Sequence, residues 1–377
     1  MAFSSIRTVS FRNLCDTEIN LDAKNIFLVG ENGQGKTNFL EAVYFASYGS
    51  SFRGTRDAGL VRTGEKDLSV SVKLDDPVYS GISVFYRDGK KSISINGKRA
   101  EDRKELLNAA PCIVFCHEDM EFVSGTPERR RWFFDQTLCL PDPVYLGDLQ
   151  NYRKVLRSRN NLLKNSGGAS GNVSSGENPF PDGNGALLDA LDLQLARYGL
   201  ELAKKRQKEA RFFSSVFEPL YGEISGLDGI SIGYIPSWKE ETEEAVMAGL
   251  NRRRENDFFA GLTVSGPHRD RYGFYRKGKE FSGQASTGQR RLLALLLRVA
   301  QARVFSQKTG RNPVLLLDDV LLELDGQKRK KFLSLMPEYD QGFFTFLPEE
   351  PYKLYRENDT IVYLVESGIL KKGTQYE

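Results

Sequence analysis

A segment near the N-terminus combines glycines, a lysine and a threonine in an order suited to holding phosphate groups. The pattern G-x-x-x-x-G-K-[ST] is matched by Gly30, Glu31, Asn32, Gly33, Gln34, Gly35, Lys36 and Thr37. The glycines let the backbone wrap a phosphate chain with its N–H groups pointing inward, and a following helix adds the positive end of its dipole. Lys36 is expected to reach the β- and γ-phosphates, and the Thr37 hydroxyl to bind Mg²⁺. The segment predicts a nucleoside triphosphate site.

Two carboxylates stand at the end of an apolar run much later in the chain. The run Leu315-Leu316-Leu317 is followed directly by Asp318 and Asp319. Asp318 is expected to hold Mg²⁺, directly or through water, and Asp319 to orient or deprotonate an attacking water. Two exposed acids at the end of a strand often have no catalytic role. Because the same chain contains a phosphate-binding loop, we interpret this pair as part of a site for triphosphate hydrolysis.

A short polar segment opens the apolar helix expected at 286–307. Ser286 is a good N-cap, and Gly288 leaves the backbone open to close approach. The order of phosphate loop, S-x-G-Q helix and acidic strand is that of ABC-type ATPases. In that layout Ser286, Gly288 and Gln289 contact the γ-phosphate held by a second subunit. Asp325 then corresponds to the D-loop and is expected to contact the same nucleotide. Thr345 corresponds to the switch position at the end of the next strand.

Length and composition limit the other options. The chain has 377 residues, enough for two to three domains, and its 40% hydrophobic and 27% charged residues are typical of a soluble globular protein. We find no apolar run of about 20 residues and no signal-peptide pattern at the N-terminus, and therefore expect a cytoplasmic protein. The four cysteines, at 15, 112, 116 and 139, form no CxxC pair, so we expect reduced thiols and no zinc site.

The hydrophobic periodicity predicts α/β ends around a helical middle. Strands are expected at 6–11, 25–29, 68–74, 82–86, 92–95, 110–116, 313–317 and 342–346, and helices at 35–45, 128–140, 143–164, 186–217, 241–259, 286–307 and 325–335. The glycine- and serine-rich stretch 165–185 is typical of a flexible loop. Leu188, Leu191, Leu195, Tyr198 and Leu202 form one apolar face, which we expect to pack against the helix at 143–164.

The net charge of +3 is unevenly spread. Residues 126–164 hold eight Lys and Arg against four Asp and Glu, and residues 197–211 hold six against two. Basic clusters bind nucleic-acid phosphates without reading sequence, although a solvated helix face has the same composition. The candidate DNA contacts are Arg53, Arg56, Arg129, Arg130, Arg131, Arg153, Lys154, Arg157 and Arg159. No base-reading motif is evident, so we expect recognition of DNA shape or junctions.

Taken in order, these segments resemble the RecF family of the ABC/SMC/Rad50-type ATPase superfamily. The resemblance covers nearly the whole chain, through 11–14, 30–42, 52–57, 118–119, 129–135, 266–270, 286–289 and 318–325. Gly266-Pro267-His268-Arg269-Asp270 is its most specific part. It implies an α/β fold: an ABC-type ATPase head, with a P-loop mixed sheet and helices, plus a short helical-arm domain.

The resemblance also implies a mechanism and partners. We expect a slow ATPase, with ATP and Mg²⁺, whose ATP-driven head-to-tail homodimer clamps duplex or gapped DNA. Recombinational repair, replication restart and recombinase loading with RecO and RecR follow from the family. Arg12 is expected to contact the nucleotide. Because no nucleophile pattern accompanies His268, we expect it to have a structural or signature-supporting role. The implied domains are 1–125 and 260–377 for the head and 126–259 for the arm.

Two other functions remain open at this stage. One is the ATPase subunit of a membrane transporter, which the basic helical middle and the segment 266–270 oppose. The other is a defence-system ATPase of the same head type, partnered with a nuclease.

Overall fold

The computed structural model describes residues 2–100, 104–165, 184–324 and 326–373, so most of the predicted loop at 165–185 lies outside the described residues. The described residues divide into two compact units. Unit 1 contains the chain up to Met120 and from Arg291 onward, and unit 2 contains Glu121–Arg290. Among the described residues, no helix is both long enough and apolar enough to cross a membrane.

Unit 1 is built on a mostly parallel sheet that carries the phosphate loop. Its strands in spatial order are β15 (Ile369–Lys372), β14 (Thr360–Glu366), β3 (Asn25–Val29), β13 (Gln341–Phe346), β12 (Val314–Leu317) and β8 (Cys112–Phe115). All neighbours pair in parallel except β14 and β15. Every residue of β3, β12 and β13 is buried, as expected for parallel strands covered on both faces. Because β3 and β12 run in the same direction, their C-terminal ends lie at the same edge of the sheet.

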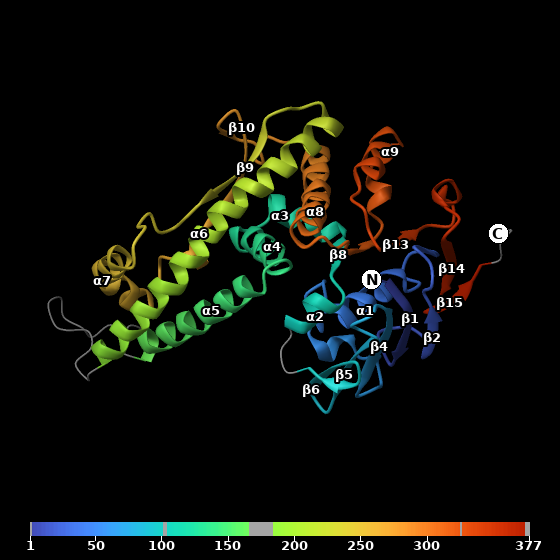
Figure 1. The fold of residues 1–377 in the computed structure, drawn as a ribbon, viewed down its shortest axis with the longest axis horizontal. Helices are drawn as coiled ribbons and strands as arrows, with labels where there is room; N and C mark the ends of the chain where they lie inside the picture. The colour runs from blue at the N-terminus through green and yellow to red at the C-terminus, as the bar shows by residue number, and fades with distance from the viewer. Residues whose placement is uncertain (1, 101–103, 166–183, 325, 374–377) are drawn as a thin grey trace. The chain divides into compact units, whose positions relative to one another are not determined.

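An antiparallel sheet and helix α1 (Lys36–Tyr48) complete the core of unit 1 (Figure 1). The strand order is β2 (Thr17–Asn20), β1 (Ala2–Val9), β4 (Leu68–Asp75), β5 (Gly81–Arg87), β6 (Lys90–Ile95) and β7 (Lys98–Arg99). One hydrophobic cluster joins α1 through Phe39 and Val43 to both sheets. Three more helices belong wholly or mostly to this unit: α2 (Lys104–Ala109), α8 (Thr287–Thr309) and α9 (Gly326–Leu335). Helix α1 is thus held from both sides.

Unit 2 is the helical arm with a small antiparallel sheet. Its helices are α3 (Glu121–Ser124), α4 (Pro127–Cys139), α5 (Pro143–Leu163), α6 (Asn184–Ser225) and α7 (Glu243–Ala260), and its strands β9 (Ile230–Ile235), β10 (Arg271–Arg276) and β11 (Lys279–Glu280). Helices α5 and α6 run alongside each other (Figure 1). Leu195 and Leu202 of α6 share a buried cluster with Tyr152 and Val155 of α5. The predicted apolar face and its packing against the helix at 143–164 are confirmed.

Two differences from the sequence expectations have physical causes. Helix α6 continues past the predicted end at 217 to Ser225, through Pro219, because Phe217, Leu220 and Tyr221 extend its buried face. The segment 260–290, assigned from the sequence to the head, lies in unit 2. Strand β10 pairs with β9 over six residues, and this pairing keeps the segment with the arm.

Candidate nucleotide-binding site and signature helix

The phosphate loop connects β3 to α1 and curls around a lysine. Lys36 is buried, and its Nζ donates to the carbonyl oxygens of Gly30 at 2.6 Å and Glu31 at 3.2 Å. An ammonium carries three donors, so these two bonds leave one for a phosphate oxygen. Gly35 has a φ of 120°, a conformation that favours glycine and turns the chain into the helix.

The C-terminal strands hold the other side of the loop. The N–H groups of Ser367 and Gly368 donate to the side chain and the carbonyl oxygen of Gln34, at 2.7 and 2.8 Å. Gly30 lies so close to β14 that a Cβ would overlap the carbonyl of Val365. Sequence reasoning missed this support. The available signal was the Ser-Gly pair between two apolar runs, which is typical of a tight turn.

The structure brings the two predicted Mg²⁺ ligands together. The Thr37 hydroxyl donates to Asp318 Oδ1 at 2.8 Å. Burial, together with the negative charges of Asp319 and Glu118, raises the pKa of Asp318 to about 6. A hydroxyl and a carboxylate are hard oxygen ligands of the kind Mg²⁺ takes. A cation would also compensate the crowded negative charge, so the residues present fit this ion.

Asp319 is held in position by the predicted switch residue. Asp319 has a φ of 53°, in the left-handed region. Its N–H donates to Thr345 Oγ1 at 2.7 Å, and the Thr345 hydroxyl lies 2.7 Å from its Oδ1. Both bonds fix the carboxylate at the end of β12. Glu350 was not singled out from the sequence; it lies near this group, and burial raises its pKa.

Arg12 lies beside α1, held by a buried carboxylate. Its Nε donates to Glu41 Oε2 at 3.0 Å, and its Nη2 to Thr55 Oγ1 at 2.9 Å. Asn38 of α1 donates to the neighbouring Asn13 at 2.7 Å. These bonds tie the Arg12 loop to the first turns of the helix after the phosphate loop, and the guanidinium is already engaged within its own unit.

The tip of the signature helix carries a reciprocal cap. The Ser286 N–H donates to Gln289 Oε1 at 2.8 Å, and the Gln289 N–H donates to Ser286 Oγ at 3.2 Å. Ser286, Thr287 and Gly288 are exposed. The fourth predicted contact of this kind, Asp325, lies outside the described residues.

The segment Gly266–Asp270 forms a hydrogen-bonding centre of the arm, in which Gly266, Pro267 and Asp270 are buried and His268 is half-buried. His268 Nε2 lies 2.9 Å from the Thr263 carbonyl oxygen, which can only accept, so this nitrogen carries the proton. The Tyr152 hydroxyl then donates to Nδ1 at 2.8 Å. Burial lowers the pKa of His268 to about 4. With both ring nitrogens engaged inside the arm, His268 has a structural position.

The predicted DNA contacts separate into exposed and internally bound side chains. The exposed ones are Arg53, Arg56, Arg129, Arg153, Lys154 and Arg157. Arg130 is half-buried and donates to two backbone carbonyls. Arg131 and Arg159 are buried, the first bound to the Asp270 carbonyl at 2.6 Å and the second to Asp192 at 2.6 Å. Naming these two as DNA contacts was wrong, because the sequence does not show that their helix faces point inward.

Comparisons with known proteins agree on one family. The family model described as RecF/RecN/SMC N terminal domain matches residues 2–350. The "DNA replication and repair protein RecF" of Treponema pallidum (strain Nichols) is 41% identical over 365 residues, covering 96% of this chain and 98% of that protein. The chain belongs to the RecF family. The RecF protein of Clostridium tetani (strain Massachusetts / E88) is 30% identical over 375 residues, covering 96% of this chain and 97% of that protein.

Solved structures extend this agreement to the fold of the RecF family. The "Structure of the recombination mediator protein RecF-ATP in RecFOR pathway" matches with a TM-score of 0.86 and 29% identity, covering 99% of this chain and 98% of that one. An SMC head bound to a domain of ScpA matches with a TM-score of 0.53 at 16% identity, and so shows the fold alone. The predicted family, the α/β ABC-type ATPase head and the assignment to DNA replication and repair are confirmed. None of these matches favours a transporter subunit or a defence ATPase.

Proposed function

We propose that this chain is an ATP-dependent DNA-binding protein of recombinational repair and replication restart, whose nucleotide-driven homodimer clamps duplex or gapped DNA. One observation carries the proposal. Lys36, Thr37 and Asp318 converge on one site, whereas the capped tip at Ser286 and Gly288 is exposed and available to a second copy.

The chain's own residues divide the work at the nucleotide. Residues 30–37 bind the triphosphate, and Thr37 with Asp318 would hold Mg²⁺, which neutralises charge on the phosphate oxygens. Asp319, fixed by Thr345, orients the attacking water and accepts its proton. Because Asp is one methylene shorter than the Glu more common at this position, its reach is shorter, which agrees with slow turnover.

The second copy completes the site. Ser286, Gly288, Gln289 and Asp325 contact the nucleotide bound by the partner, and Arg12 contacts the nucleotide within its own subunit. ATP binds the closed dimer better than separate heads, so nucleotide shifts the population toward the dimer. Hydrolysis removes that preference and opens the clamp.

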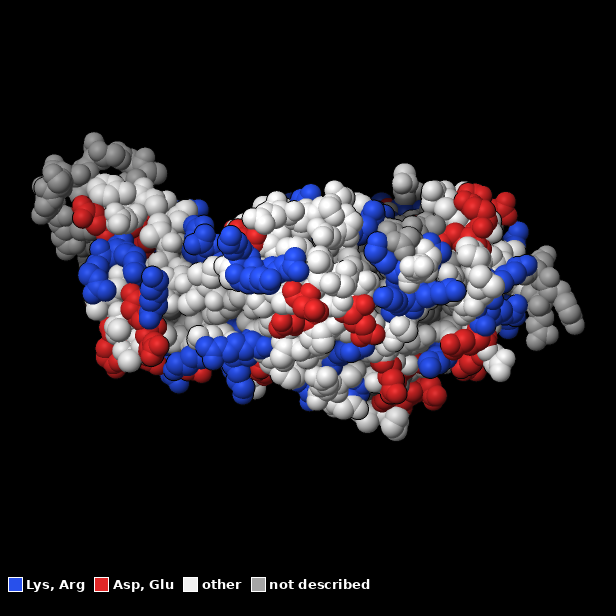
Figure 2. Space-filling model, turned by 90° about the horizontal axis from the view of Figure 1, so that it is seen from above, with Lys and Arg blue, Asp and Glu red and all other residues white. Residues whose placement is uncertain are grey.

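DNA contacts come from exposed cations and do not read sequence. Arg53 and Arg56 of the head, and Arg129, Arg153, Lys154 and Arg157 of the arm, supply charge and reach for phosphates. Figure 2 shows Lys and Arg gathered in short runs separated by acidic side chains on the face in view. RecO and RecR are proposed partners, supported by the RecFOR pathway named for the solved relative. A cytoplasmic location is part of the same proposal, supported by DNA as the proposed substrate.

Sedimentation velocity with ATP, Mg²⁺ and gapped DNA tests the proposal. The wild type is expected to form dimers, and Lys36→Met to stay monomeric because it loses the phosphate ligand. Ser286→Arg should keep nucleotide binding and lose dimerisation and DNA retention. Ser334→Arg, an exposed serine of α9, is the matched control and should behave as wild type.

Two outcomes would contradict the proposal. A wild type that stays monomeric at high protein concentration with all ligands present would refute the clamp. Loss of nucleotide binding in Ser286→Arg would show that this serine does not act on a partner's nucleotide.

A further inference from the structure

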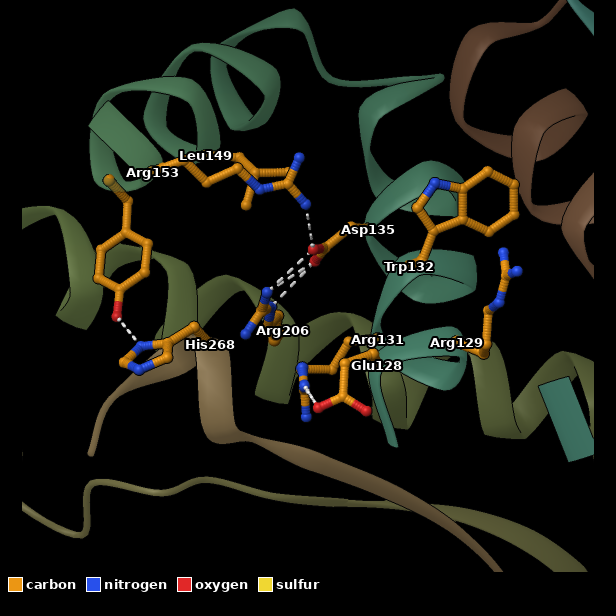
Figure 3. A pocket seen from close by; sticks show the side chains of 10 residues that line it. Glu128, Arg129, Arg131, Trp132, Asp135, Leu149, Arg153, Arg206 and His268 are labelled. Carbon is orange, nitrogen blue, oxygen red and sulfur yellow. Dashed lines mark hydrogen bonds and ion pairs between the residues drawn. The ribbon is translucent and has the colours of Figure 1, made fainter. Parts of the chain in front are cut away.

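The arm contains a cavity that the nucleotide site does not use. Its volume is about 380 Å³, within the range of small-molecule sites, and residues of unit 2 alone line it (Figure 3). Helix α4 contributes Arg129 and Trp132, helix α5 contributes Arg153, and His268 lies on the opposite side. The cavity therefore belongs to the helical arm.

The floor of the cavity is formed by polar side chains that hydrogen-bond within the arm, namely Arg131, Asp135, Arg206 and His268. The guanidinium of Arg206 donates to Asp135 Oδ1 at 2.8 Å and to Asp270 Oδ2 at 2.7 Å. Arg131 donates to the Asp270 carbonyl oxygen at 2.6 Å. His268 is bound through both ring nitrogens and is neutral at pH 7, since burial lowers its pKa to about 4. The floor thus gives the cavity a fixed shape and leaves binding chemistry to the rim.

The rim combines an aromatic ring with two exposed arginines. Each arginine also pairs with a carboxylate of the arm, Arg129 with Glu121 at 2.8 Å and Arg153 with Asp135 at 3.4 Å. Trp132 is 39% exposed, and it stacks on Phe122 with ring centroids 5.8 Å apart. The side chains of Arg129 and Arg153 are 57% and 55% exposed. Arg129 and Trp132 are three residues apart and share one face of α4, whereas Arg153 reaches in from α5 (Figure 3). A flat ring between cations is the combination that binds a base together with its phosphates.

The surroundings favour nucleic acid over an acidic peptide. The lining holds four arginines against one Asp and one Glu, a net charge of +2 with neutral His268, and Glu121 beside Arg129 lowers the local total to +1. Beyond the rim, the exposed Lys154 and Arg157 continue the positive charge along α5. An isolated carboxylate would use only one of these cations. A DNA strand presents a series of phosphates and can use several of them. The volume suits one nucleotide and excludes a duplex, whose bases are stacked and paired.

We propose that this cavity holds one unpaired nucleotide of single-stranded DNA, with its base stacked on Trp132 and its phosphates against Arg129 and Arg153. This inference rests on the proposed DNA-binding function and specifies which part of a gapped substrate the arm recognises. A gap or strand end supplies such a nucleotide, whereas intact duplex does not. The arm would thereby distinguish gapped DNA from paired DNA.

Binding to two matched DNA molecules tests the inference. Fluorescence anisotropy with ATP and Mg²⁺ compares a gapped duplex with a fully paired duplex of the same sequence. Trp132→Ala is expected to weaken binding to the gapped molecule about fivefold or more, from the loss of base stacking, and to leave the paired one unchanged. Trp132→Phe should stay within about twofold of wild type because it keeps a stacking ring. Phe259→Ala removes another exposed aromatic of the arm, from α7, and should change neither affinity.

A second readout reports stacking directly. 2-Aminopurine placed in the gap should be quenched by wild type and not by Trp132→Ala. Equal loss on both DNA molecules, or no loss on either, would overturn the inference while leaving the proposed clamp intact. Trp132-dependent binding of an oligo-aspartate peptide, without Trp132 dependence on gapped DNA, would identify a peptide site and overturn it as well. A wild type that binds neither DNA would instead refute the proposed function.

Discussion

His268 should make the stability of the helical arm depend on pH. Its pKa lies at about 4 in the folded protein because the ring is buried, against 6.5 for an ordinary histidine. Between these values the unfolded chain binds a proton that the folded arm excludes. Folding stability from this residue is therefore fully present above pH 6.5, falls as pH drops from 6.5 to about 4, and changes no further below that.

The gap between the two pKa values sets the size of the effect. It corresponds to about 3 kcal/mol of unfolding free energy over the whole window, and to about 2 kcal/mol between pH 7 and pH 5. His268→Gln stays neutral at both pH values but loses part of the bonding to Tyr152 and Thr263. We expect it to be less stable than wild type by about 1–3 kcal/mol at pH 7, and this difference to shrink by about 2 kcal/mol at pH 5.

Urea unfolding followed by tryptophan fluorescence measures this effect in the arm specifically. The chain has two tryptophans, and both Trp132 and Trp238 lie in unit 2. His117→Asn removes the other imidazole, which is exposed in unit 1, and serves as the control. If the stability difference between wild type and His268→Gln is the same at pH 7 and pH 5, the assignment of a neutral, buried imidazole is refuted.

Three further substitutions test other contacts. Arg206→Met leaves buried Asp270 without its cation and Asp135 with only the longer Arg153 contact at 3.4 Å, and should lower the unfolding free energy of the arm by about 3–5 kcal/mol in the same urea assay. Thr345→Val removes the hydroxyl that holds Asp319, and should slow ATP hydrolysis about tenfold while nucleotide affinity stays unchanged. Gly368→Ala places a Cβ on the Asn13 carbonyl at a φ of +80°, and should weaken nucleotide binding and lower the melting temperature.

Each of these has a control and a contradicting result. Lys204→Met removes a cation whose partner, Glu201, is exposed, and should lower the unfolding free energy by less than about 1 kcal/mol. If Arg206→Met lowers the unfolding free energy by no more than Lys204→Met does, the buried ion pairs of Arg206 do not stabilise the arm. A Thr345→Val enzyme with normal turnover would separate this threonine from catalysis. Gly326→Ala adds a Cβ to open space and should keep the wild-type melting temperature, and an unchanged Gly368→Ala would contradict the close approach of the Asn13 loop.

Local patterns in the sequence were enough to predict most elements and the chemistry of the nucleotide site. The continuous apolar runs of β3 and β12 predicted buried strands, which the structure confirms. Thr37 and Asp318 were both predicted as Mg²⁺ ligands after apolar strands, and they meet because β3 and β12 lie in one parallel sheet with β13 between them. The Lys36 contacts of the phosphate loop and the signature cap join residues no more than six positions apart, so this part of the geometry can be predicted from local sequence.

Only the tertiary structure decided which charges are available and what supports the loop. Arg131 and Arg159 resemble the exposed Arg153 and Arg157 in sequence, yet burial against carbonyl and carboxylate groups removes them from the surface. The support of Gln34 by Ser367 and Gly368 joins segments more than 330 residues apart. The placement of 260–290 with the arm likewise follows from the pairing of β9 with β10. Long-range pairings of this kind leave no periodic pattern in the chain, because they are set by packing between elements.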